Sequence, residues 1–481
     1  MKPQEQDNMK RDTRWYDYIL ININYLALTT RSQTLAPLII PVLVQQFLGD
    51  EGKGAAVGTI RLWALMAAVL AQALFGLLSD RSRSKFGRRR PFILFGSVSE
   101  VVIFMLIGFA AVTFSGNTGY MVLFVLYIIS MLSSNLGHAA TQSLIPDLVP
   151  EEKRGMASGI KALFELPIPV ILVSLLIAPQ VAKNNLWLAL GMTSFVVLLG
   201  AGLTMLVKEK PVTEDPAPID WKPFLNLFLM TVVFTVVILG TGEIVNSVGN
   251  LATQLDGNFL MVVAGILGMA VAVVIGVRLS ITTALGFKET SQRKSYVWWV
   301  INRLAFMVGL TNLATFMVYF LQEKFDLVRE AAAVPASQVT MLVGVFVLLL
   351  AIPTGWLADR FGKKLLLVIS GLIAAAGVAV LLVFPGMEGV YLAGVMVGAA
   401  AGIFYSANWA LGTSLVPADN PGKYLGIQNL AGAGAGAIGA YLGGPIGDKG
   451  GYVILFIIYG FMFLLSALAL LGIREPELKT G

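Results

Sequence analysis

Ionisable side chains inside long apolar segments are the residues of this sequence best suited to chemistry. Arg31 and Gln33 lie in a polar run near the middle of the first apolar segment. A charge inside a membrane costs several kcal/mol, so such residues usually face protein, water or a solute. The planar guanidinium of Arg31 suits a carboxylate, a phosphate or a cluster of hydroxyls, which indicates a binding site for a polar solute. The alternative is an arginine paired with an internal acid.

Three polar residues share one face of a later segment. Asn135, His138 and Gln142 stand at i, i+3 and i+7, a spacing that places them on the same side of a helix. His138 is the only histidine, and it could transfer a proton near neutral pH. It could equally be an ordinary hydrogen-bonding group. We expect all three residues to contact solute, and proton transfer at His138 stays open.

Two carboxylates in the first half are the candidates for cation coupling. Glu100 and Glu165 lie within apolar segments, where each could bind a proton or, with neighbouring oxygens, a sodium ion. Lys161 precedes Glu165 by four residues and can pair with it along one helix face, so a structural ion pair is the alternative. Arg61 lies near the end of its segment and is expected to extend its charge toward the membrane surface.

The second half of the chain contains a group of aromatic and amide residues. Tyr405, Asn408 and Trp409 lie close together on one segment, and Arg303 and Asn312 lie on another. A sugar ring requires an apolar face for stacking and donors for its hydroxyls, which such residues provide. We predict that these residues contact solute, although aromatic residues also serve packing and interfacial roles in membrane proteins.

A basic loop separates two apolar segments in the first half and recurs in the second. The first copy runs from Gly76 to Pro91 and the second, shorter copy from Gly355 to Lys364. A carboxylate at the end of a span can accept charge-assisted hydrogen bonds from arginines and from a helix N-terminus, and such a contact can lock one conformation and release in another. The alternative is that the arginines only orient the chain in the membrane. The residues predicted to gate in this way are Asp80, Arg81, Gly87, Arg89, Asp359 and Arg360.

Apolar segments of about 20 residues, each long enough to cross a bilayer, recur along the whole chain. We predict an all-α polytopic membrane protein with fourteen transmembrane helices, near residues 17–47, 56–79, 91–113, 119–145, 155–180, 186–207, 223–243, 259–284, 295–321, 337–358, 364–384, 389–414, 423–446 and 452–473. The duplicated loop indicates two homologous halves. The expected domains are a six-helix bundle at 1–207, a linker with two extra helices at 208–294, and a second six-helix bundle at 295–481.

Composition excludes several classes of protein. Of the 481 residues, 57% are apolar and only 13% are charged, about half the charge of an ordinary soluble domain. The chain has no cysteine, which excludes disulfides, thiolate metal sites and cysteine nucleophiles. We find no phosphate-binding loop, no histidine cluster and no soluble catalytic domain, so we expect neither an enzyme nor a cofactor or metal site. The net charge of +6 lies in loops on one side of the membrane, which predicts cytoplasmic termini and no nucleic-acid partner.

The duplicated loop resembles the signature of the major facilitator superfamily. Its longer first form, with residues 35–41, 143–155 and 408–427, is similar to the sucrose-transporter and glycoside–cation symporter branch. Plant sucrose carriers have an arginine where this chain has Gln142, and bacterial relatives often have an acid where it has Asn408.

This resemblance implies alternating access between two six-helix bundles, with the solute bound near mid-membrane between them. It implies a monomeric secondary transporter in the inner membrane that moves a small polar solute, such as a sugar or glycoside, coupled to a proton or sodium gradient. Two alternatives stay open: an exporter of amphipathic compounds, and a non-transporting protein of membrane assembly or pigment handling.

Overall fold

The computed structural model describes residues 14–209, 219–255, 257–416 and 421–474, and in this part of the chain all regular structure is helical. The side chains of residues 152 and 359, and most of those between 421 and 431, lie outside this description. Helices are the expected outcome for apolar segments in a bilayer, because a helix satisfies its own backbone hydrogen bonds where water is absent.

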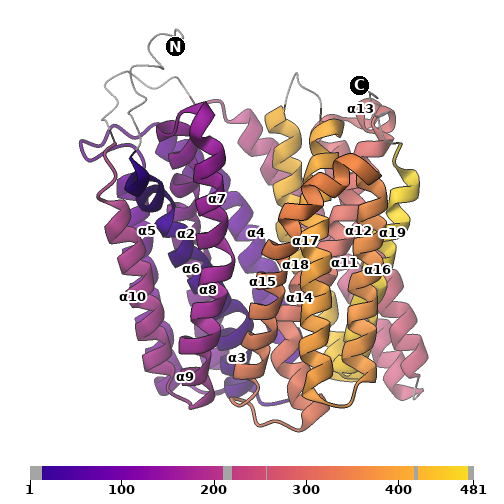
Figure 1. Ribbon diagram of the computed structural model, residues 1–481. Helices are drawn as coiled ribbons and strands as arrows, with labels where there is room; N and C mark the ends of the chain where they lie inside the picture. Colours follow the sequence, from indigo (N-terminus) through magenta and orange to yellow (C-terminus); the bar gives the residue numbers. More distant parts are fainter. Residues whose placement is uncertain (1–13, 210–218, 256, 417–420, 475–481) are drawn as a thin grey trace.

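The first half of the chain forms one bundle, coloured indigo to magenta in Figure 1. Its helices are α2 (Trp15–Thr34), α3 (Ile40–Leu48), α4 (Lys53–Asp80), α5 (Arg90–Thr113), α6 (Gly116–Leu148), α7 (Arg154–Glu165), α8 (Pro167–Leu172), α9 (Ala178–Ala182) and α10 (Leu186–Thr204). Two π-helical turns, Leu35–Ile39 and Val173–Ile177, interrupt the first and fifth spans. Each π-helical turn contains the residue four positions before a proline, Pro41 or Pro179. In an α-helix the proline ring would clash with the carbonyl of that residue, and the wider π-helical turn makes room for it.

The second half forms the orange and yellow bundle in Figure 1. Its helices are α14 (Lys294–Phe325), α15 (Ala333–Phe361), α16 (Lys363–Val383), α17 (Met387–Leu415), α18 (Pro421–Gly450) and α19 (Tyr452–Ala469). Between the halves in sequence lie α11 (Lys222–Gln254), α12 (Asn258–Leu285) and the short α13 (Phe287–Gln292). Helices α11 and α12 pack against each other and against α18.

Thirteen helical segments of the described chain are long and apolar enough to cross a membrane. The remaining predicted span, residues 423–446, falls in α18, whose first turns lie partly outside the description. The count of fourteen, the reading of α11 and α12 as an insertion, and the division at residues 207 and 294 therefore stay predictions. The all-helical membrane architecture itself is confirmed.

We call the end of the molecule that bears the loop at residues 81–89 the near face, and the opposite end the far face. At the far face the two halves are in close contact. The Asp448 carboxylate at the end of α18 accepts hydrogen bonds from the backbone N–H groups of Gly54 and Ala55, both at 2.8 Å, and so caps the first turn of α4. The Tyr319 hydroxyl of α14 donates to the Pro41 carbonyl at 2.7 Å.

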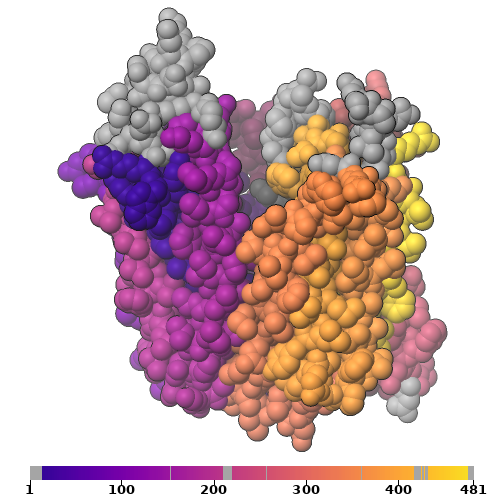
Figure 2. Space-filling model, in the orientation of Figure 1, coloured from indigo at the N-terminus to yellow at the C-terminus, as the bar shows by residue number. Residues whose placement is uncertain are grey.

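Glycine makes this contact possible. A Cβ at Gly58 of α4 would lie 2.3 Å from the Ala440 carbonyl oxygen of α18, and a Cβ at Gly444 of α18 would lie 2.1 Å from the Gly54 carbonyl oxygen of α4. Toward the near face the two halves separate, and Figure 2 shows the molecule hollowed between the magenta helices of the first half and the orange helices of the second. The fold therefore has a gap between its halves that is closed at the far face.

Candidate functional site

A buried ion pair lies inside the first half. Arg31 of α2 donates from Nε to Glu100 Oε1 of α5 at 2.7 Å, and its Nη2 donates to the Ser130 hydroxyl of α6 at 2.5 Å. Both charged side chains are below 5% exposed. Ser130 also donates to Glu100 Oε1. The structure thus gives Arg31 an internal acid, which is the alternative that the sequence left open, and it seals both residues from the gap in this conformation.

Six polar residues contact one another in the first half, and one of them, Glu165, lies within electrostatic range of Tyr405 in the second half; we call them the N-wall cluster. Its members are Tyr25, Gln72, His138, Gln142, Lys161 and Glu165. Lys161 Nζ lies 3.5 Å from Glu165 Oε2 and 4.6 Å from the centre of the Tyr25 ring. Gln142 contacts His138 Nε2 at 3.0 Å and accepts from Gln72 at 3.0 Å. The cluster draws on α2, α4, α6 and α7, and Glu165 is its most open charge, with 45% of its side chain exposed.

The predicted face of α6 is therefore only partly at the gap. His138 and Gln142 belong to the N-wall cluster, whereas the Asn135 amide is buried and donates to the Met131 carbonyl of its own helix at 2.8 Å. Gln33 lies elsewhere, in a small crevice between the halves that Ser337 and Thr340 of α15 also line.

A second group, the C-wall cluster, lies in the other half and comprises Arg303, Tyr405, Asn408 and Trp409. Arg303 of α14 donates to Asn408 Oδ1 of α17 at 3.0 Å. The Asn408 amide nitrogen donates to Asn302 Oδ1 at 2.9 Å, so Asn408 is fully buried and holds Arg303 from behind. Tyr405 and Trp409 are 37% and 54% exposed, and Tyr405 lies within electrostatic range of Glu165 in the first half.

Asn312, also predicted to contact solute, serves a packing role. Its amide donates to the Ala435 carbonyl of α18 at 3.1 Å and to the Val308 carbonyl of its own helix at 2.9 Å. It is completely buried, and a Cβ at Gly439 would overlap it at 2.1 Å. Asn312 therefore fixes α14 against α18 below the gap.

Arg61 of α4 is a site residue that sequence reasoning placed differently. It was expected to extend toward the membrane surface, but the structure directs it inward, where a Cβ at Gly436 of α18 would lie 3.5 Å from its Nη2 and 4.0 Å from Thr311 Oγ1. Its Nε is buried and has no hydrogen-bond partner in the described chain. Arg61 thus lies between the two halves, at the level where α4 packs against Gly436 of α18. The signal missed was the pair of glycines Gly54 and Gly58, which let α18 approach α4 near this level.

The basic loop forms a network at the near face. Arg89 forms ion pairs with Asp80 at the end of α4 and, at 2.9 Å, with Asp147 near the end of α6. It also donates to the Ser79 hydroxyl at 2.6 Å. Arg88 reaches the same Asp147 oxygen at 2.7 Å. All of these contacts stay within the first half, so in this conformation the network does not bridge the gap.

Glu209 completes this network and was not identified from the sequence. Its carboxylate accepts from the backbone N–H of Arg89 at 2.8 Å and from that of Arg90 at 3.3 Å, which caps the first turn of α5. Burial raises the pKa of the Glu209 carboxyl, although the backbone donors oppose the shift. Gly87 has φ +105°, and a Cβ there would lie 2.3 Å from Glu209, so only glycine fits the predicted gating position.

The other predicted gating residues have simpler surroundings. Arg81 donates to the Leu77 carbonyl at 3.2 Å and so caps the end of α4. Arg360 is exposed and lies over the Trp356 ring at 5.5 Å. The side chain of Asp359 lies outside the described residues.

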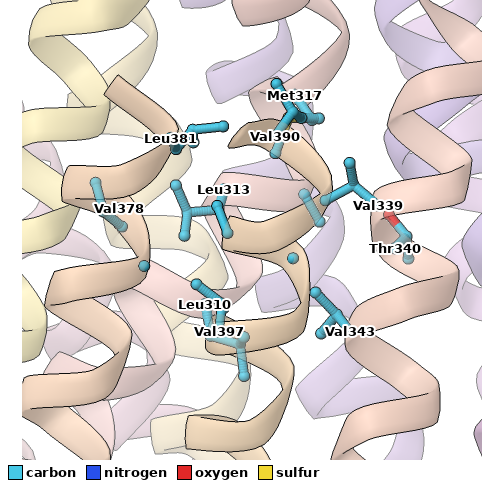
Figure 3. Close-up of a pocket in the computed structure, with 14 residues that line it drawn as sticks. Leu310, Leu313, Met317, Val339, Thr340, Val343, Val378, Leu381, Val390 and Val397 are labelled. Carbon is cyan, nitrogen blue, oxygen red and sulfur yellow. The ribbon is translucent and has the colours of Figure 1, made fainter. Parts of the chain in front are cut away.

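A separate apolar cavity lies within the second half, between α14, α15, α16 and α17 (Figure 3). Its volume is about 50 Å³ and Thr340 is its one polar side chain, so it cannot bind a polar solute of sugar size. In the described residues no three histidine, aspartate or glutamate side chains are grouped as metal ligands. The N-wall and C-wall clusters with Arg61 therefore form the candidate site.

Comparisons with known proteins agree with this architecture. A family model described as MFS/sugar transport protein matches residues 52–223, and one described as Major Facilitator Superfamily matches residues 299–481. Sucrose transport protein SUC4 of Arabidopsis thaliana is 34% identical over 110 residues, which cover 21% of this chain and 22% of that protein. The chain aligns with about a fifth of the length of the curated relatives that it matches.

Solved structures share the fold over almost the whole chain. A peptide transporter in complex with sulfate has a TM-score of 0.69 at 15% identity and covers 98% of both chains. The xylose transporter XylE of E. coli, in an inward open conformation, has a TM-score of 0.64 at 17% identity and covers 96% of this chain and 97% of that one. At such low identity these likenesses establish the fold alone.

Proposed function

This chain belongs to the major facilitator superfamily, and from that premise we propose that it transports a small polar solute, such as a sugar or glycoside, by alternating access. It is a secondary transporter and an integral membrane protein, not an enzyme. The match to a sugar-transport family model and the short similarity to sucrose transport proteins support the solute class. We further propose that it acts as a monomer in the inner membrane with both termini cytoplasmic.

The observation that supports this function best is the polar gap that closes at one end. The far face is sealed by Asp448 over the first turn of α4 and by Tyr319 against Pro41, and Glu165 of the N-wall cluster acts electrostatically on Tyr405 of the C-wall cluster in the other half. The basic loop lies at the near face, and positive residues favour the cytoplasmic side. In our proposal the conformation is inward-facing, and the opposite state forms when the far-face contacts break and the near face closes.

We assign cation coupling to Glu165 in preference to Glu100. Glu165 is half-exposed in the gap and is held by Lys161 at 3.5 Å, so a proton or sodium ion can reach it. Glu100 is sealed with Arg31 and Ser130 and becomes accessible only if that pair opens. An exporter of amphipathic compounds is less consistent with this site, because charged and amide side chains make up most of the N-wall and C-wall clusters.

Ligand-dependent thermal stability of the purified protein tests the proposal. A solute that binds the native state raises the unfolding temperature by mass action. We expect stabilisation by one or more sugars or glycosides, with a dependence on pH or sodium that Glu165→Gln removes. Stabilisation by amphipathic compounds alone would instead identify an exporter.

A further inference from the structure

Two arginines at the gap lack a carboxylate partner. Neither Arg61 nor Arg303 forms an ion pair in the part of the chain that the structure describes. Arg303 donates only to the Asn408 amide oxygen, and its Nε is buried without an acceptor. Arg61 has no hydrogen bond among the described residues, and its Nε is buried in the same way. Both side chains keep accessible surface, so both have donors available to a bound molecule.

Two other cationic side chains within the spans of the described chain differ from these arginines. Arg31 is matched by Glu100 at 2.7 Å, and Lys161 is matched by Glu165 at 3.5 Å. When these two pairs are set aside, Arg61 and Arg303 leave an excess of two positive charges. An arginine stays protonated at every physiological pH, so the excess cannot be removed by titration. An unpaired charge away from bulk water costs free energy unless a ligand of opposite charge pairs with it.

The two arginines lie at different depths of the same gap. Arg303 is nine residues into α14 from the near face, or about 14 Å along the helix axis. Arg61 is eight residues into α4 from the far face, or about 12 Å, at the level where α4 meets Gly436 of α18. Arg61 therefore lies farther from the near face than Arg303, where α4 packs against α18 through Leu65 and Arg61. A solute that enters from the near face meets Arg303 first and Arg61 last.

We propose that the transported solute is an organic anion, whose carboxylate or phosphate group is bound first by Arg303 and then, deeper between the two halves, by Arg61. The inference rests on the proposed transport function and narrows its solute to an acidic sugar or sugar phosphate. The guanidinium fork of each arginine matches two oxygens of such a group. Tyr405, which lies within electrostatic range of Arg303, provides aromatic surface for the apolar face of the sugar ring.

The alternative is that Arg303 has a structural role in closing the near face, and this alternative predicts a different result for its variants. Glu165 acts electrostatically on Tyr405, which is also within range of Arg303, so closure of the near face could pair Arg303 with Glu165 across the gap. In that case Arg303 would affect the rate of interconversion between conformations. It would not affect the affinity of the inward-facing state for an anion.

The test measures thermal stabilisation by D-glucuronate and D-glucose 6-phosphate, with D-glucose as the neutral probe of the same ring. We expect the two anions to stabilise the wild-type protein at concentrations where D-glucose does not. Arg303→Gln and Arg61→Gln should each weaken anion binding about tenfold or more, which corresponds to the loss of one charge-assisted contact. Arg303→Lys and Arg61→Lys keep the charge and should retain part of the affinity.

Arg278→Gln is the matched control, because it removes the same charge from an exposed position of α12 outside the gap. It should leave the affinity for both anions unchanged. Equal stabilisation by D-glucose and the anions, or full anion affinity in Arg303→Gln and Arg61→Gln, would overturn the inference. If either result overturns the inference but D-glucose binds, the proposed sugar transport stands. If neither anion nor any neutral sugar binds or enters proteoliposomes, both proposals fail.

Discussion

Substitution of Gly58 by alanine tests whether the contact of α4 with α18 is the closed gate. A Cβ at this position would lie 2.3 Å from the Ala440 carbonyl oxygen and 3.0 Å from the Ala440 carbonyl carbon. An ordinary contact between carbon and oxygen is about 3.4 Å, so the two helices must separate by about 1 Å to admit the methyl group. The separation is required only while the far face is closed.

The expected size of the effect follows from this geometry. Overpacking a close contact costs about 1–3 kcal/mol. Since the cost applies to the closed far face and not to the open one, the equilibrium should shift about 5- to 150-fold toward the state with an open far face. A protein held inward-facing by this contact would then spend measurably more time outward-facing.

The assay measures the labelling rate of a single introduced cysteine, which is possible because the sequence contains no cysteine of its own. A single Ser337→Cys change places a reporter at the closed interface of α15 with the fifth span, where Ser337 is 4% exposed and lies 3.5 Å from the Ser174 hydroxyl. We expect Gly58→Ala to raise its labelling rate at least fivefold. Gly191→Ala is the control, because a Cβ at Gly191 has no neighbour within 4 Å. An unchanged labelling rate in folded Gly58→Ala protein would refute the assignment of this contact as the gate.

Three further substitutions test the charged groups. Arg31→Met should lower the free energy of unfolding by about 3–5 kcal/mol, because it leaves Glu100 buried and unpaired. The double variant Arg31→Met with Glu100→Leu should recover most of that loss. If Arg31→Met alone were as stable as wild type in thermal unfolding, the pairing would be contradicted. Asp80→Asn should slow transport without preventing membrane insertion, since it removes a partner of Arg89, and unchanged uptake kinetics would argue against gating. Glu165→Gln should abolish cation dependence of uptake, and a retained proton or sodium requirement would move coupling to another residue.

The helices were largely predictable from the sequence because each span has its own hydrophobic signal. Predicted residues 91–113 correspond to Arg90–Thr113, and predicted residues 259–284 correspond to Asn258–Leu285. The pairing of Lys161 with Glu165 was also accessible, because an i, i+4 spacing places two residues together within one helix. These features depend on local sequence and not on how the helices pack.

The partners of residues on different helices were not predictable in the same way. Arg31 meets Glu100 across 69 positions of sequence, and Arg89 meets Asp147 across 58. Arg61 was misplaced because its direction depends on the approach of α18, which belongs to the other half of the chain. One sequence shows that such residues are polar within apolar segments, but it does not show which of them face each other and which face the gap.

Gradient-driven uptake in proteoliposomes is the most direct test of the account. Purified wild-type protein would be reconstituted with an imposed inward proton or sodium gradient, and labelled sugars and sugar acids would be supplied outside. We predict accumulation above the external concentration that collapses with an ionophore and is absent from protein-free vesicles. Binding of a solute without any gradient-dependent accumulation would contradict the claim that this protein is a coupled secondary transporter.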